Sequence, residues 1–183
     1  MLEKGNHEEY SSVNHEKVGE HTILHIIDEA LRLEETLSPI LEEDVRFKSL
    51  LESLRQSINA THKEMRAAGM VNECADCAAA GEGTCCTVRT HHKYDKLLLL
   101  INLLLGTSLP RGAGLPGMCH FLTEHGCILT ARHVICVNFL CRRLRENIQH
   151  WKLVRVQEVA GEELKTLFML EEYLKKRTRS LDK

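Results

Sequence analysis

Residues 97–105 read LLLLINLLL, and this run decides the fold because eight of its nine positions are aliphatic and only Asn102 is polar. A helix that is apolar nearly all round is buried on all sides. The run is also much shorter than the roughly 20 residues that a membrane-spanning helix needs. We therefore predict a buried central helix over residues 94–105, ended by Gly106, and no membrane span.

Helical patterns flank this central run. On its N-terminal side, apolar residues spaced three and four apart predict one helix from about Ile23 and a second from Ser38-Pro39 to Gly69. We expect these two helices to form an antiparallel hairpin within residues 1–70. Residues 142–183 predict a C-terminal helical tail with a break at Gly161. Its expected apolar face comprises Ile148, Trp151, Leu164, Leu167, Phe168 and Leu174.

The eight cysteines all lie in residues 71–141, four on each side of the central helix. The first group is Cys74-x2-Cys77-x7-Cys85-Cys86, and the second is Cys119-x7-Cys127-x8-Cys136-x4-Cys141. Thiolates are soft ligands that suit zinc and iron–sulfur clusters, and a Cys-x2-Cys step brings two of them to one metal from one turn of backbone. We predict a metal site built from these cysteines on two irregular, loop-like segments.

The predicted fold class is mostly α with little or no β, in one compact domain. The helical hairpin (1–70) and the C-terminal helices (142–183) would surround a cysteine-rich metal-binding segment (71–141) that contains the buried helix. The chain begins without an apolar leader, so we expect a cytoplasmic protein with reduced thiols. Its formal net charge of −2 argues against a dedicated nucleic-acid binder. We expect no nucleic acid and no membrane as partners, and the apolar helices would serve a protein partner or a homodimer.

Other roles for the cysteines stay open beside metal binding. They are disulfides, free buried thiols, and a reactive redox pair at Cys74 and Cys77. A nearby histidine would also serve as a ligand in place of a thiolate, and the candidates are His120, His125 and His133.

The cysteine pattern resembles a family of zinc- or iron-chelating domains named for its Cys-x2-Cys-x2-Cys-Cys motif, which also includes flagellin lysine methylase. The similarity covers residues 74–141. It lies in Cys74-x2-Cys77…Cys85-Cys86, in Cys119-His-Phe-Leu, and in Gly126-Cys127-Ile-Leu-x2-Arg132-x3-Cys136-x2-Phe139-x-Cys141. The seven residues between Cys77 and Cys85, and His133 where the family usually has proline, depart from the pattern. The resemblance implies that thiolates bind zinc or an iron–sulfur cluster.

Three functions remain candidates at this point. The first is a protein that binds an iron–sulfur cluster for electron transfer or to support a reaction. The second is a structural zinc module that acts as a protein-interaction scaffold, since closed thiolate sites stabilise a fold without an open coordination position. The third is a cluster-dependent enzyme such as a protein methyl-transfer enzyme. The chain has no glycine-rich nucleotide loop after a strand, so whether it is an enzyme stays open.

Overall fold

The computed structural model of the protein describes residues 13–80, 84–112 and 114–181. These residues are mostly helical, as predicted, and their only sheet is a hairpin of two two-residue strands. The elements in chain order are α1 (Val13–Leu41), α2 (Val45–Ala68), α3 (Met70–Ala80), α4 (Val88–His91), α5 (Lys96–Leu104), β1 (Leu122–Thr123), β2 (Gly126–Cys127), α6 (Val134–Asn138), α7 (Arg142–Asn147) and α8 (His150–Leu181).

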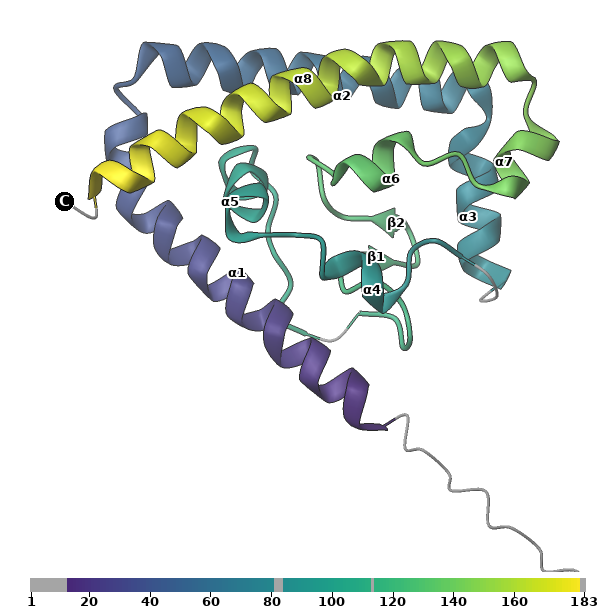
Figure 1. Ribbon diagram of the computed structural model, residues 1–183, viewed down its shortest axis with the longest axis horizontal. Helices are drawn as coiled ribbons and strands as arrows, with labels where there is room; N and C mark the ends of the chain where they lie inside the picture. Colours follow the sequence, from purple (N-terminus) through teal and green to yellow (C-terminus); the bar gives the residue numbers. More distant parts are fainter. Residues whose placement is uncertain (1–12, 81–83, 113, 182–183) are drawn as a thin grey trace, which may run out of the picture.

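The long helices form a frame around the cysteine-rich segment. Figure 1 shows α2 and α8 side by side along one edge, with α1 running off at an angle and α5 between α1 and α8. The two helices of the expected hairpin are both present, but each has its main contacts elsewhere, because α2 packs along α8 and α1 packs on α5. The space inside the frame holds α4, α6 and the β hairpin.

The predicted central helix is α5, and residues 97–102 are all buried. Asp95 begins the helix by accepting hydrogen bonds from the backbone N–H groups of Leu97 and Leu98. Gly106 follows its end with φ +89°, a conformation that favours glycine. Within the described ranges, no helix combines the length and the apolar character needed to cross a bilayer.

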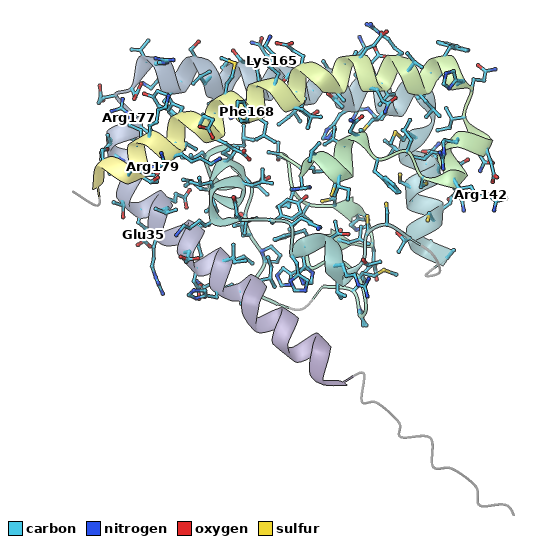
Figure 2. The ribbon with its side chains drawn as sticks, in the orientation of Figure 1. Glu35, Arg142, Lys165, Phe168, Arg177 and Arg179 are labelled. Atoms are coloured by element: carbon cyan, nitrogen blue, oxygen red, sulfur yellow. The ribbon has the colours of Figure 1, made fainter. Side chains whose placement is uncertain are left out.

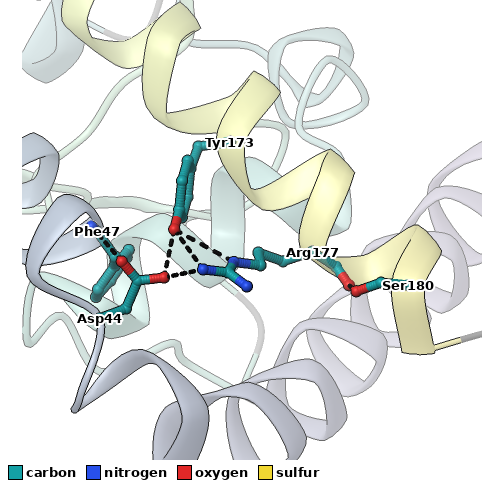
Figure 3. Close-up of polar contacts among 5 residues, drawn as sticks. All are labelled: Asp44, Phe47, Tyr173, Arg177 and Ser180. Carbon is teal, nitrogen blue, oxygen red and sulfur yellow. Dashed lines mark hydrogen bonds and ion pairs between the residues drawn. The ribbon is translucent and has the colours of Figure 1, made fainter.

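The boundary between the first two helices lies later than predicted. Pro39 does not begin a new helix. It lies in the last turn of α1, which continues to Leu41. The N-cap of α2 is Asp44, which accepts a hydrogen bond from the N–H of Phe47 at 3.0 Å. The same carboxylate accepts hydrogen bonds from the Tyr173 hydroxyl and the Arg177 guanidinium (Figure 3), so it also joins the C-terminal part of α8 to the start of α2.

The helical tail is interrupted before Gly161. It consists of α7 and α8, and α8 runs without a break through Gly161. Two residues of the expected apolar face are solvent-exposed, namely Trp151 at 64% and Phe168 at 61%. With 3.6 residues per turn, Trp151 and Phe168 do not lie on the face of the helix that packs against α2. Leu167 and Leu174 do lie on that face, and both are buried.

The buried apolar side chains form two clusters. The main cluster lies among α1, α2, α5, the C-terminal half of α8 and the loops that follow α5. The smaller cluster joins the end of α2 and the start of α3 to α6, α7 and the first part of α8. Three cysteines pack against the main cluster or belong to it (Cys86, Cys119 and Cys136), whereas Cys141 packs against the smaller one. The cysteine-rich region therefore lies where the two clusters meet.

Candidate metal centre

The first two cysteines lie on a helix, which corrects the prediction that both cysteine segments are loops. Cys74 and Cys77 belong to α3, where a spacing of three residues places them on the same face. The alanines of this segment are strong helix formers, so the helix forms although its apolar pattern is too short to be recognised. Gly69 ends α2 with φ +83°, as predicted, and lets α3 begin in a new direction directly after it.

A polar contact holds α3 against α7. Glu73 accepts hydrogen bonds at one carboxylate oxygen from Arg143 Nε at 2.8 Å and from Asn147 Nδ2 at 2.9 Å. These hydrogen bonds, that from Asn147 first, lower the pKa of Glu73. Cys141 is the N-cap residue of α7, so this contact brings it towards Cys74 and Cys77.

The vicinal pair Cys85-Cys86 is held in a short loop by backbone contacts. The Cys85 carbonyl accepts a hydrogen bond from the Thr90 hydroxyl at 2.6 Å, and the Cys86 carbonyl accepts one from the Cys119 N–H at 3.0 Å. The Cys86 N–H in turn donates to the Thr84 hydroxyl at 3.2 Å. The pair therefore connects the first cysteine segment to the second.

The remaining cysteines come from the hairpin and from α6. Cys127 lies on β2 opposite Leu122, after a turn at Gly126 that has φ +103°. Cys136 lies on α6, a second place where a cysteine predicted to be in a loop is helical. Its sulfur accepts a hydrogen bond from the Tyr94 hydroxyl at 3.6 Å.

All eight cysteines line two adjoining cavities. The first cavity, of about 690 Å³, is lined by Cys74, Cys85, Cys86, Cys119, Cys127 and Cys136. The second, of about 400 Å³, is lined by Cys74, Cys77, Cys85, Cys86, Cys136 and Cys141. Sulfur atoms, yellow in Figure 2, accordingly gather around α3, α6 and the hairpin. All eight cysteines lie in the described part of the chain, and all have free thiols.

The thiols do not form a ready-made ligand set. Among the residues that the structure describes, no three His, Cys, Asp or Glu side chains are arranged as a group that could hold a metal ion. The donor set nevertheless has the soft character that zinc and iron–sulfur clusters prefer. Metal binding in these cavities would require the cysteine side chains to turn inward.

The surroundings favour protonated thiols in the metal-free protein. Burial raises the pKa of Cys74 to about 11 and that of Cys119 to about 12. Burial also raises the pKa of Cys127 and Cys136. The pKa of Cys86 is instead lowered, because the Cys85 thiol donates a hydrogen bond to its sulfur. Since metals bind thiolates, binding would displace protons and would become weaker as the pH falls.

Arg132 is a cation at the wall of the first cavity. Its side chain lines the first cavity, and its charge lowers the pKa of Cys74, Cys127 and Cys136, opposing the effect of burial. Among the described residues, its buried Nε has no hydrogen-bond partner, and its Nη2 lies 3.3 Å from Met65 Sδ. A guanidinium in this position would stabilise negative charge on thiolates or on a bound cluster.

Within the described ranges, the three candidate histidines do not surround the thiols. His120 donates from Nε2 to the Pro110 carbonyl at 3.0 Å, and His133 accepts at Nδ1 from the Ile135 N–H at 3.2 Å. Only His125 lines the first cavity. His91, the last residue of α4, is buried and accepts a hydrogen bond from the His120 N–H.

Tyr94 is a site residue that sequence reasoning missed. Besides donating to Cys136, its hydroxyl accepts a hydrogen bond from the His133 N–H at 3.1 Å, and its ring packs against Phe121. The available signal was a lone aromatic residue between the cysteine groups, directly before the cap of the central helix. Asn138, two residues after Cys136, accepts a hydrogen bond from Gln157.

Comparison with protein-family models, curated proteins and solved structures finds no match to this chain. The chemistry of the site is therefore inferred from its own residues.

Proposed function

We propose that the protein binds a soft metal centre through cysteine thiolates in the two adjoining cavities, with an iron–sulfur cluster as the first candidate and zinc as the second. One observation carries this proposal. Cysteines from two segments separated by the buried helix α5 converge on the same cavities, and the chain has no cysteine elsewhere. Free thiols placed only for packing would not need to converge in this way.

The size of the first cavity favours a cluster over a single ion. In a closed zinc site, four thiolates surround one ion at about 2.3 Å. A space of about 690 Å³ is far larger than such a site needs, whereas a polynuclear cluster with its sulfides would occupy more of it. The Arg132 charge at the wall would offset part of the negative charge of a thiolate-ligated cluster.

Anaerobic purification tests the proposal directly. We expect a brown protein that contains iron and acid-labile sulfide and has a visible thiolate-to-iron absorption band. A colourless protein with stoichiometric zinc would instead support the zinc module. A protein without bound metal after both iron–sulfide reconstitution and zinc addition, with eight freely titratable thiols, would overturn the proposal.

A variant comparison separates specific from adventitious metal. Replacement of Cys86 and Cys136 with serine removes two cysteines that line both cavities, so metal content should fall strongly. The matched control is Ser53→Ala on α2, an exposed hydroxyl far along the chain from either cysteine segment, which should leave metal content unchanged. Equal metal content in the two variants would indicate surface-bound metal only.

A further inference from the structure

The two cavities differ in the cysteines that line only one of them. Cys119 and Cys127 line only the first cavity, whereas Cys77 and Cys141 line only the second. Four cysteines are common to both cavities, namely Cys74, Cys85, Cys86 and Cys136. Each cavity is thus lined by two cysteines of its own and by the four cysteines that line both.

Backbone and side-chain contacts divide the common cysteines between the two sides. Cys74 is one helical turn from Cys77 on α3, and the Glu73–Arg143 contact holds that helix against α7, which begins after Cys141. On the other side, the Cys86 carbonyl bonds to the Cys119 N–H.

Tyr94 connects Cys136 to the hairpin segment that carries Cys119 and Cys127. Its hydroxyl donates to the Cys136 sulfur, and its ring lies 5.2 Å from that of Phe121, between Cys119 and Cys127 in the hairpin segment. The boundary between the two groups of cysteines then falls between Cys85 and Cys86. Cys86 belongs to the group near the β hairpin, and Cys85 is the remaining cysteine, which we assign to the group near α3.

We infer that the protein holds two separate metal centres, one ligated by Cys74, Cys77, Cys85 and Cys141 and the other by Cys86, Cys119, Cys127 and Cys136. This inference rests on the proposed thiolate function and assigns all eight ligands. Four thiolates complete the coordination of a tetrahedral zinc ion or of a four-iron cluster, so each group suffices for one closed centre. The adjacent residues Cys85 and Cys86 serve different centres.

Zinc titration of the anaerobic, metal-free protein tests this division, because one zinc ion takes four thiolates. We expect two zinc ions per wild-type chain. The double variant Cys77→Ser/Cys141→Ser should bind one, the double variant Cys119→Ser/Cys127→Ser should bind one, and the combination of all four substitutions should bind none. Ser53→Ala should bind two, as wild type does.

Several outcomes overturn the division while leaving the proposed function intact. One is a wild-type chain that binds a single zinc ion, and another is either double variant losing both ions. Wild-type protein that takes up neither zinc nor iron would instead reject the proposed function itself. The two failures are therefore distinguishable.

Differential alkylation of the wild-type chain covers the case in which a double variant does not fold. At one equivalent of zinc, the species that carries four alkyl labels is isolated and its labels are located by top-down mass spectrometry. We expect the labels to occupy one complete group of four or the other. Labels distributed across both groups within one molecule would overturn the division.

Discussion

Asn102 is a fully buried amide in the most apolar helix of the protein, and it connects that helix to the chain that carries the site. Its Nδ2 donates to the carbonyls of Leu98 and Ala131, and its Oδ1 accepts from the Ala131 N–H at 3.0 Å. Both polar backbone groups of Ala131 are thereby satisfied in the interior. The single amide fixes the segment that continues into Arg132.

Replacement of Asn102 with leucine should destabilise the protein although it makes α5 more apolar. It leaves the N–H and C=O of Ala131 buried without partners, and we expect the free energy of unfolding to fall by about 1–3 kcal/mol. Urea denaturation measures this change. Asn138→Leu, at an exposed asparagine, serves as the control and should change stability by less than about 0.5 kcal/mol. Equal effects of the two substitutions would contradict the role assigned to Asn102.

Asp44 predicts an acid-dependent loss of stability. Hydrogen bonds from Tyr173 first, and then from Phe47 and Arg177, lower the pKa of its carboxyl from 3.8 to about 2. A folded-state pKa below the unfolded one contributes stability at higher pH, and this contribution is lost as the pH falls from about 4 to about 2. Asp44→Asn should therefore show a weaker dependence of unfolding free energy on pH in that window.

The measurement is chemical denaturation at several pH values. Glu73 and Glu172 also have lowered pKa values, so part of the dependence will remain in Asp44→Asn. Glu42→Gln, at an exposed carboxyl in the same turn, is the control and should retain the wild-type dependence. Identical pH profiles for wild type and Asp44→Asn would show that the contact in Figure 3 contributes nothing.

At the scale of the elements, the sequence predicts long and strongly periodic helices well and short ones poorly. The buried helix and the ends of helices at Gly69 and Gly106 were predicted, because an apolar run and a left-handed glycine are local signals. The sequence does not predict the helix over residues 70–80, because three turns rich in alanine carry little amphipathic pattern. The prediction of a helix start at Pro39 is wrong, because it rests on the preference of proline for the first turn of a helix, whereas Pro39 lies inside α1.

The candidate site shows a similar division. Clustering of the cysteines in the sequence predicts a metal site built from all eight. The structure places the eight cysteines along two adjoining cavities, and metal binding itself stays a prediction. Their distribution over two cavities was not predictable, because it depends on how α3 meets α7 and how the hairpin meets Cys86. These are long-range contacts that no local pattern encodes.

The junction of α3 and α7 makes a prediction of its own. Arg143→Ala removes the cation that binds Glu73 and lies 3.9 Å from Asp76, so the two helices should separate more readily. In metal-free protein, we expect Cys77 and Cys141 to react with iodoacetamide several-fold faster, as measured by peptide mapping.

The neighbouring arginine provides a matched control for this prediction. Arg142 pairs with Glu146 on its own helix, so Arg142→Ala removes the same charge without separating α3 from α7. It should leave both alkylation rates near those of wild type. Equal acceleration in the two variants would indicate a general effect of charge rather than of helix contact.

At the scale of the whole molecule, two apolar clusters share α2 and α8. We expect them to unfold as one unit, because each long helix contributes side chains to both clusters. Leu153→Ala in the smaller cluster and Leu170→Ala in the main one should each lower the free energy of unfolding by about 2–5 kcal/mol. Both variants should retain a single transition.

Two probes check this cooperativity. Fluorescence of Trp151, the only tryptophan, reports on the start of α8, and far-ultraviolet circular dichroism reports on all helices. Their denaturation curves should coincide. Phe168→Ala, at an exposed position of the same helix, should have little effect. Separate transitions for the two probes would show that the clusters unfold independently.

The position of α8 in the chain has a consequence for the order in which the protein is made. Because α8 covers α2 and follows both cysteine segments, a ribosome releases all eight thiols before it releases the helix that completes both clusters. During that interval the apolar clusters around the thiols are incomplete, so the thiols are exposed to oxidants and free metal ions. The synthesis of α8 thus ends the period in which the cysteines are exposed to reaction with oxidants and metal ions.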